Sequence, residues 1–238
     1  MLNRAVSAEW SRLLASLGVK TDGVTVVAGS HAVRLADSLQ ASGVHPIAGA
    51  ADEVVVCAET EGYDLEGAIP SATGLPGDSA DLVVLAHAWD GRTTLAPVLE
   101  EAMRIARPGA GIVACEFDLG RILRSRPAQY PAVLLYSACP DVAATVAARH
   151  VDPGFLEMSV VNAGIRGGQV TRFERTVRVA PVDEYLADVS VRGWRGADEV
   201  DADEADDILG QLGTLAEKLA GDGVFTETEP WVVVRGWA

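Results

Sequence analysis

The feature that most constrains the fold of this chain is a series of short apolar segments that alternate with helical patterns. Residues 24–28 (Val-Thr-Val-Val-Ala) favour a strand and lead through Gly29 into a helical stretch at 32–41. Residues 81–86 form a second apolar run, which is followed by a helical pattern over 95–106. Strands that are apolar along their length are buried on both faces, and strands that alternate with helices form a parallel sheet. The pattern therefore predicts an α/β fold, a mostly parallel sheet with helices on both faces.

The same reasoning places the other elements. Strands are expected at 24–28, 44–49, 65–69, 82–86 and 111–116, with a C-terminal antiparallel pair at 170–179 and 230–235. Helices are expected at 7–17, 32–41, 95–106, 182–189 and 202–219, with two more between residues 121 and 150, and residues 53–57 also have the propensity of a strand. The acid-rich run 198–207 predicts a solvated helix start, because acidic side chains are favourable near a helix N-terminus.

Length and charge exclude several classes of function. A chain of 238 residues, 49% of them hydrophobic, can form a full core without a disulfide or a metal ion. The net charge of −15 argues against nucleic acid as a partner and disfavours an anionic membrane surface. Three widely spaced cysteines without a C-x-x-C pattern, and no secretory signal, predict a soluble cytoplasmic protein. The four histidines lack metal-ligand spacing, so no metal site is expected.

Two segments resemble the class I S-adenosylmethionine-dependent methyltransferases that act on small molecules. Residues 72–84, Ala-Thr-Gly-Leu-Pro-Gly-Asp-Ser-Ala-Asp-Leu-Val-Val, are similar to the family's acid-Ala-x-x-Leu-Pro-Phe-x-x-x-x-Phe-Asp-x-Val segment, which crosses under the adenine and enters the fourth strand. Residues 99–109 resemble the helix and turn that precede the fifth strand. The resemblance implies a Rossmann-like methyltransferase fold with a seven-stranded sheet. The alternative is another doubly wound α/β fold.

The resemblance also implies a single domain from 1 to 238. Its parts are an N-terminal helix in 1–22, a cofactor-type half in 23–120, and a helical insertion with the C-terminal strands in 121–238.

The family's cofactor motif is largely missing from this chain. In the family, the first strand ends in acid-x-Gly-x-Gly-x-Gly, whose acid holds the amino group of the cofactor and whose glycines let the backbone approach its methionine part. The matching run begins at Val27, which replaces the acid, and keeps only Gly29. His31 and Val33 replace the other glycines, and a β-branched residue does not easily take a positive φ. We expect these two side chains to fill part of the methionine pocket.

The acid that holds the ribose hydroxyls has three candidate positions. In such folds it lies about 20 residues beyond the first glycine, and that count from Gly29 reaches Ala50. Asp52 lies two residues further, and Glu59 is the candidate if 54–57 is the second strand.

Family spacing favours Ala50, because the distance from the first glycine to Leu75 needs no insertion. This choice makes 44–49 the second strand and forces 53–61 into a helix in spite of its valines. The acid near the adenine falls on Ser71. The family-equivalent cofactor positions are thus Gly29, Ser30, His31, Ala50, Ser71 and Ala72.

Three acids and two glycines of the family's site are missing together. Each lost charged contact costs about 1.5–3 kcal/mol, so two or three losses weaken binding by roughly two to six powers of ten. The sequence predicts a methyltransferase-like protein with impaired or lost S-adenosylmethionine binding, which acts as a non-catalytic binding or regulatory partner. Its ligand is then a small molecule or a protein, and the sequence leaves open whether it forms homo- or hetero-oligomers.

Two alternatives remain. One is an active S-adenosylmethionine-dependent methyltransferase on a small molecule, with divergent contacts from Ser30, His31 and Ser71. The other is a different reaction in the same crevice, lined by His87, Trp89 and Asp90. His87 follows the predicted fourth strand and is the candidate general base, since imidazole accepts protons at neutral pH. The competing interpretation is a histidine that caps a helix or is satisfied within the core.

Overall fold

The computed structural model describes residues 13, 16–18, 23–29, 54–57, 72–89, 91–188, 200–220 and 223–238. The chain divides into two compact units. The first consists of Met1–Phe117, Val151–Phe173 and Trp231–Ala238. The second consists of Asp118–His150 and Glu174–Pro230. Each unit has a hydrophobic core of its own.

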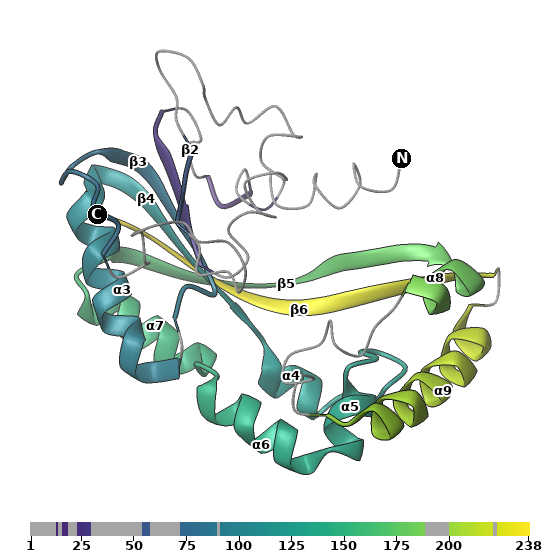
Figure 1. The fold of residues 1–238 in the computed structure, drawn as a ribbon. Helices are drawn as coiled ribbons and strands as arrows, with labels where there is room; N and C mark the ends of the chain where they lie inside the picture. Colours follow the sequence, from purple (N-terminus) through teal and green to yellow (C-terminus); the bar gives the residue numbers. More distant parts are fainter. Residues whose placement is uncertain are drawn as a thin grey trace. The chain divides into compact units, whose positions relative to one another are not determined.

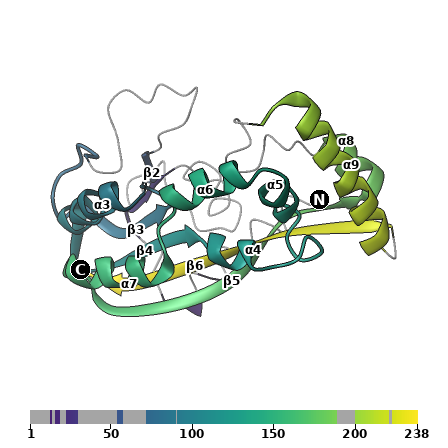
Figure 2. The same cartoon turned by 90° about the horizontal axis from the view of Figure 1, so that it is seen from below.

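A six-stranded sheet runs through the described residues. Its strands are β1 (Thr25–Ala28), β2 (Val54–Cys57), β3 (Ala80–Ala86), β4 (Ala106–Phe117), β5 (Arg166–Pro181) and β6 (Val224–Trp237). Their order in the sheet is β2-β1-β3-β4-β6-β5 (Figure 1). Strands β2, β1, β3 and β4 are parallel, and β6 is antiparallel to β4, with Ala114 opposite Val234. Strands β5 and β6 are neighbours in the sheet and lie side by side in both views (Figures 1 and 2).

This arrangement confirms the predicted mostly parallel α/β sheet. Strand β1 lies in the interior of the sheet, because Val26 pairs with Val55 on one side and with Val83 on the other. The predicted strands at 82–86 and 111–116 and the C-terminal pair are present. The described residues hold six strands instead of the expected seven. The strands expected at 44–49 and 65–69 fall outside the described residues, as does the helix expected at 32–41.

The predicted helix over 53–61 is wrong. Val54–Cys57 is strand β2, in parallel register with β1 from Thr25 to Ala28. Three consecutive valines favour a pleated strand, and this local preference prevails over the family spacing on which the helix prediction was based. With 54–57 as the second strand, Glu59 replaces Ala50 as the candidate for the ribose acid; both residues lie outside the described parts of the chain.

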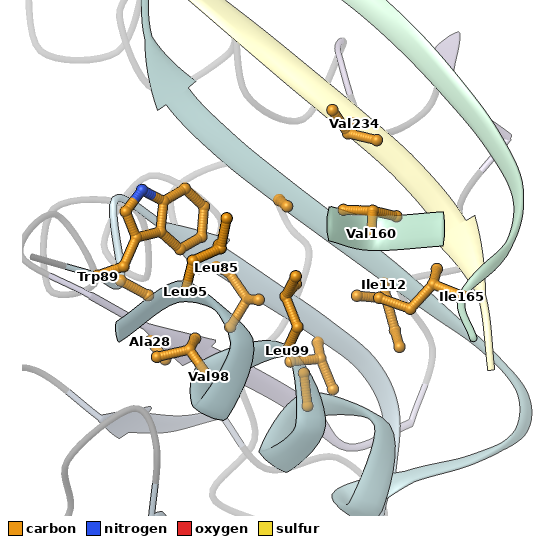
Figure 3. Close-up of a cluster of buried hydrophobic side chains, with 14 of the residues drawn as sticks. Ala28, Leu85, Trp89, Leu95, Val98, Leu99, Ile112, Val160, Ile165 and Val234 are labelled. Atoms are coloured by element: carbon orange, nitrogen blue, oxygen red, sulfur yellow. The ribbon is translucent and has the colours of Figure 1, made fainter. Parts of the chain in front are cut away.

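Strands β1, β3 and β4 are buried on both faces over most of their length. Val26, Val83 and Ile112 lie on the face whose hydrophobic cluster includes helices α3 (Gly91–Ile105) and α7 (Pro153–Asn162). Side chains that alternate with them, such as Val27 and Val84, are also fully buried. Figure 3 shows Leu95, Val98 and Leu99 of α3 and Val160 of α7 among this cluster. Burial on both faces explains the apolar runs 26–28, 82–86 and 110–115 in these strands.

Helix α3 confirms the helix predicted over 95–106, while α7 was not predicted. Helix α7 has a clear start signal, because the Asp152 carboxylate accepts hydrogen bonds from the backbone N–H groups of Gly154 and Phe155, and Pro153 follows at the first helical position.

The second unit contains five helices among the described residues. They are α4 (Leu119–Leu123), α5 (Val133–Ala138), α6 (Pro140–Arg149), α8 (Val182–Asp188) and α9 (Ala202–Leu219). The two helices expected between residues 121 and 150 are in fact three short ones, because the prolines of this segment separate α4 from α5 and open α6. The bounds of α9 agree with the prediction, and Asp201 caps its start. Tyr185, Leu212, Ala216 and Phe225 form the core of this unit.

Candidate functional site

The candidate site lies at the carboxyl ends of β1, β3 and β4, within the first unit. Ligands of open parallel sheets bind at this edge. Gly29 follows β1 with a φ of +114°. A Cβ atom at Gly29 would lie 2.3 Å from the Ala86 carbonyl oxygen and 2.9 Å from the Cα of Ala88. Close packing of the β1 turn against the end of β3 thus requires a glycine, whether or not a cofactor binds there.

His87 follows β3 in a strained backbone conformation. Its φ is +52°, and Asp78 is the other non-glycine residue with a positive φ among the described parts of the chain. The His87 N–H donates to the carbonyl oxygen of Cys115 at 3.0 Å, which continues the contact between β3 and β4 by one residue. Such conformations persist where the surrounding structure fixes them, and they concentrate at functional sites.

A buried carboxylate supports the His87 ring. Glu116, near the end of β4, has a side chain that is 0% exposed. Its Oε1 atom lies 2.9 Å from Nδ1 of His87 and accepts from the backbone N–H of Phe117 at 2.7 Å. Its Oε2 atom accepts from the indole N–H of Trp89 at 2.6 Å. A buried carboxylate needs such donors, because burial without them is costly.

The donors fix the chemical role of each group in the cluster. The Trp89 indole and the Phe117 amide can only donate, so the Glu116 carboxylate is the acceptor for both. The same carboxylate favours the tautomer of His87 in which Nδ1 carries the proton. Burial, and then the neighbouring charge of Glu116, raise the pKa of the Cys115 thiol, which keeps this thiol protonated. Cys115 is therefore no nucleophile here.

Trp89 and His87 differ in their access to solvent. The Trp89 indole is 4% exposed, and Figure 3 shows it beside Leu85 and Leu95 with its nitrogen turned away from these aliphatic side chains. The His87 side chain is 20% exposed and its ring meets the indole edge-on, with centroids 6.5 Å apart. The imidazole is thus the most exposed of the three side chains in the cluster. Together, the imidazole and the buried carboxylate can accept a proton and stabilise the resulting cation.

A second polar cluster fixes the segment that resembles the adenine-crossing segment of the family. The N–H and hydroxyl of Thr73 donate to Oε1 of Glu101 at 2.9 and 2.5 Å. Arg104 donates to both Glu101 oxygens and to the carbonyl of Leu75. Arg104, and next Thr73, lower the pKa of Glu101 to about 2 against the opposing effect of burial. This cluster ties the segment to α3 and is structural in character.

The structure brings two of the predicted site residues to one edge. Gly29 contacts the backbone on either side of His87, and Glu116 completes the site. Ala72 is exposed and precedes the segment tied to α3. Ser30, His31, Ala50 and Ser71, like Val33 and Asp90, fall outside the described residues, so the expected filling of the methionine pocket is untested there.

Glu116 was missed at the level of sequence. Its signal is a single acid within the apolar run 111–117, since acids are almost never fully buried unless they are paired. The parts of the chain that the structure describes hold no group of three or more His, Cys, Asp or Glu side chains suited to a metal ion. No helix within these parts is long and apolar enough to span a membrane.

Comparisons with known proteins identify the fold. No protein-family model matches the chain, and no curated protein matches its sequence. Among solved structures, it is similar to a SAM-dependent methyltransferase from Archaeoglobus fulgidus, with 13% identity, a TM-score of 0.50, and 98% of this chain and 94% of that chain covered. It is also similar to the YcgJ protein of Bacillus subtilis, at 10% identity and a TM-score of 0.47, over 96% and 97% of the two chains.

A third similar structure is phosphoethanolamine N-methyltransferase 2 of Haemonchus contortus in complex with S-adenosyl-L-methionine. The identity is 11% and the TM-score 0.46, over 97% of this chain and 52% of that one. The fold of this chain is therefore the Rossmann-like α/β fold of the SAM-dependent methyltransferases.

Proposed function

We propose that this chain is a methyltransferase-fold protein that binds S-adenosylmethionine weakly or not at all and serves as a non-catalytic binding protein. The observation that carries the proposal is Val27. It stands where the family has the acid for the cofactor's amino group, and its side chain is 0% exposed within the sheet. Its strand partners at that level are Val56 and Val84. An apolar side chain buried at this position offers the amino group no charge partner.

The expected loss of affinity follows from the number of missing contacts. With Glu59 as the candidate for the ribose acid, the acids missing from the family's pattern are two, at Val27 and Ser71. Two lost charged contacts at about 1.5–3 kcal/mol each weaken binding by roughly two to four powers of ten. If the cofactor binds with a dissociation constant of about 1 μM when all contacts are present, this loss raises the constant to about 0.1–10 mM. The replaced glycines are not included in this range.

A different small molecule is the ligand most consistent with the site. The His87–Glu116 pair keeps a polar group at the edge where ligands of this fold class bind. The net charge of −15 disfavours nucleic acid as the partner. Cys115 and Cys139 are buried free thiols, which supports a reducing location such as the cytoplasm.

An active SAM-dependent methyltransferase is the second candidate function. Its support comes from the sequence: with 54–57 as the second strand, Glu59 is the candidate for the acid that holds the ribose hydroxyls. Because Val27 offers no charge to the cofactor's amino group, this candidate requires that another residue binds that group.

Thermal melting with S-adenosylhomocysteine separates the two candidates. A ligand present at 1,000 times its dissociation constant stabilises the folded state by about 4.1 kcal/mol, and one present at its dissociation constant by about 0.4 kcal/mol. For a chain of this size, 1 kcal/mol shifts Tm by about 2–4 °C. Across the expected range of dissociation constants, we expect 1 mM ligand to raise Tm by no more than about 5 °C, with adenosine alone as the control. A rise near 10 °C would establish the methyltransferase candidate instead.

A further inference from the structure

We propose that the outer face of α7 is the contact surface of a homodimer, in which Met158 and Val161 pack against the same helix of a second copy of this chain. This contact concerns assembly, so it does not depend on whether the crevice at the sheet edge binds S-adenosylmethionine. Two features of the first unit carry the inference, which are the exposed apolar side chains of α7 and the charged side chains on either side of them.

Helix α7 is apolar on the side that faces solvent as well as on the side that faces the core. Leu156 and Val160, one turn apart, are 0% and 1% exposed, and Figure 3 shows Val160 within the buried cluster. Met158 lies midway between them in sequence and therefore points the other way, since an α-helix has 3.6 residues per turn. Met158 and Val161 are 60% and 58% exposed, the highest values for large hydrophobic side chains in the described parts of the chain. A helix that is apolar all round is normally covered on every side.

The two flanks of this outer face carry opposite charges. On one flank, the Arg92 guanidinium of α3 lies over the Phe155 ring, 4.8 Å from its centroid. Glu157 lies on the other flank, because Phe155 and Glu157 fall on opposite sides of Met158 around the helix. Arg92 and Glu157 are both exposed, and the side chain of neither forms an ion pair or a hydrogen bond with a residue that the structure describes.

A second copy of the chain complements both flanks at once. A two-fold axis parallel to α7 places each Arg92 flank against the Glu157 flank of the other copy, so the same ion pair forms twice and Met158 meets its own counterpart. The two charges also lie at a similar level along the helix. Phe155, which Arg92 covers, precedes Glu157 by two residues, which is about 3 Å along the helix axis.

The charge of the whole chain favours a second copy as the occupant of this surface. Two copies with a net charge of −15 repel each other, so they can meet only where the local charge is balanced. The outer face of α7 meets this condition, because Glu157 is the only ionisable side chain between Pro153 and Asn162 and Arg92 offsets it. A strongly basic partner would instead be attracted to an acidic surface such as the first turn of α9.

Sedimentation equilibrium of the full-length protein without ligand, over about 1 μM to 1 mM, tests this contact. The interface is small, because the ten residues of α7 span about 15 Å, so we expect a reversible monomer–dimer equilibrium in this range. Met158→Glu should weaken dimerisation at least about tenfold, because the two-fold axis brings two carboxylates together in an apolar contact. Leu219→Glu, where the side chain is 43% exposed at the end of α9, should leave the equilibrium unchanged.

Exchange of the two charges tests the pairing itself. Arg92→Glu or Glu157→Arg alone should weaken dimerisation at least about fourfold, because like charges then face each other at both pairs. The double variant should recover most of this loss, a result that misfolding or general stickiness cannot produce. A monomer at every concentration, a dimer that Met158→Glu does not affect, or a double variant as weak as the single ones would each overturn the inference. A monomer that binds an apolar dye at Met158 would assign the face to another occupant and overturn it as well.

Discussion

Glu116 is the residue on which the candidate site depends most. Its two buried oxygens accept hydrogen bonds from the Trp89 indole and the Phe117 amide and contact Nδ1 of His87. In Glu116→Gln, one acceptor oxygen becomes an N–H₂ group that faces donors, so we expect a loss of about 1.5–3 kcal/mol in the free energy of unfolding. Urea denaturation measures it, with Glu100→Gln as a control expected within about 0.5 kcal/mol of the unaltered protein. A Glu116→Gln loss as small as that of the control would show that the cluster contributes no stability.

Of the two residues in this pair, His87 was predictable from the sequence and Glu116 was not. His87 could be identified because it follows an apolar strand, and strand ends carry the ligands of this fold class. Glu116 could not be paired with it, because the two lie 29 residues apart and meet through the register of β3 on β4. That register depends on pairing between strands, which a pattern within one segment does not specify. The polar cluster of the candidate site lies at the carboxyl ends of β3 and β4. The family's cofactor motif had instead directed the prediction to the turn after β1.

At the scale of elements, long periodic segments were predictable and short ones were not. The bounds of α9 follow from an apolar stripe and an Asp201 cap. Helix α7 lacks such a stripe, because it is apolar on its outer face as well, with Met158 and Val161 exposed. The predicted helix over 53–61 is wrong because family spacing is a weaker guide here than three adjacent β-branched residues. Local propensity prevailed at β2, where the strand is only four residues long.

The contact between the 72–79 segment and α3 gives a pH-dependent prediction. The pKa of Glu101 is lowered to about 2 in the folded protein, first by Arg104 and then by Thr73. A lowered folded-state pKa contributes stability that is fully present above the unfolded value of about 4.5 and is lost as pH falls toward 2. Glu101→Gln should therefore be less stable by about 1.5–3 kcal/mol at pH 7, and its difference from the unaltered protein should shrink between pH 5 and pH 3.

Urea denaturation at pH 7, 5 and 3.5 measures this difference. The neighbouring exposed Glu100 is the matched control, and Glu100→Gln should follow the unaltered protein at each pH. A Glu101→Gln difference that stays constant across this range would contradict the role of the ionised carboxylate in tying the segment to α3.

For the whole molecule, sharing the methyltransferase fold does not imply sharing the family's cofactor-binding residues. The chain has the methyltransferase fold at only 13% identity to a solved structure of that fold, and the positions that match the family's cofactor motif by sequence mostly carry other residue types. A buried sheet tolerates such change, because apolar side chains of suitable volume can replace each other. A charged contact to a ligand cannot be replaced in that way. Function on this fold therefore has to be inferred from the site and not from the architecture.

The central claim is that this crevice does not bind the methyltransferase cofactor with useful affinity. Calorimetric titration of the full-length protein with S-adenosylhomocysteine measures this affinity, with phosphoethanolamine N-methyltransferase 2 of Haemonchus contortus titrated in parallel as the positive control. We expect no saturable heat below about 0.1 mM ligand, since two charged contacts are missing. A one-to-one isotherm with a micromolar Kd would contradict it, and would identify the chain as a cofactor-binding methyltransferase.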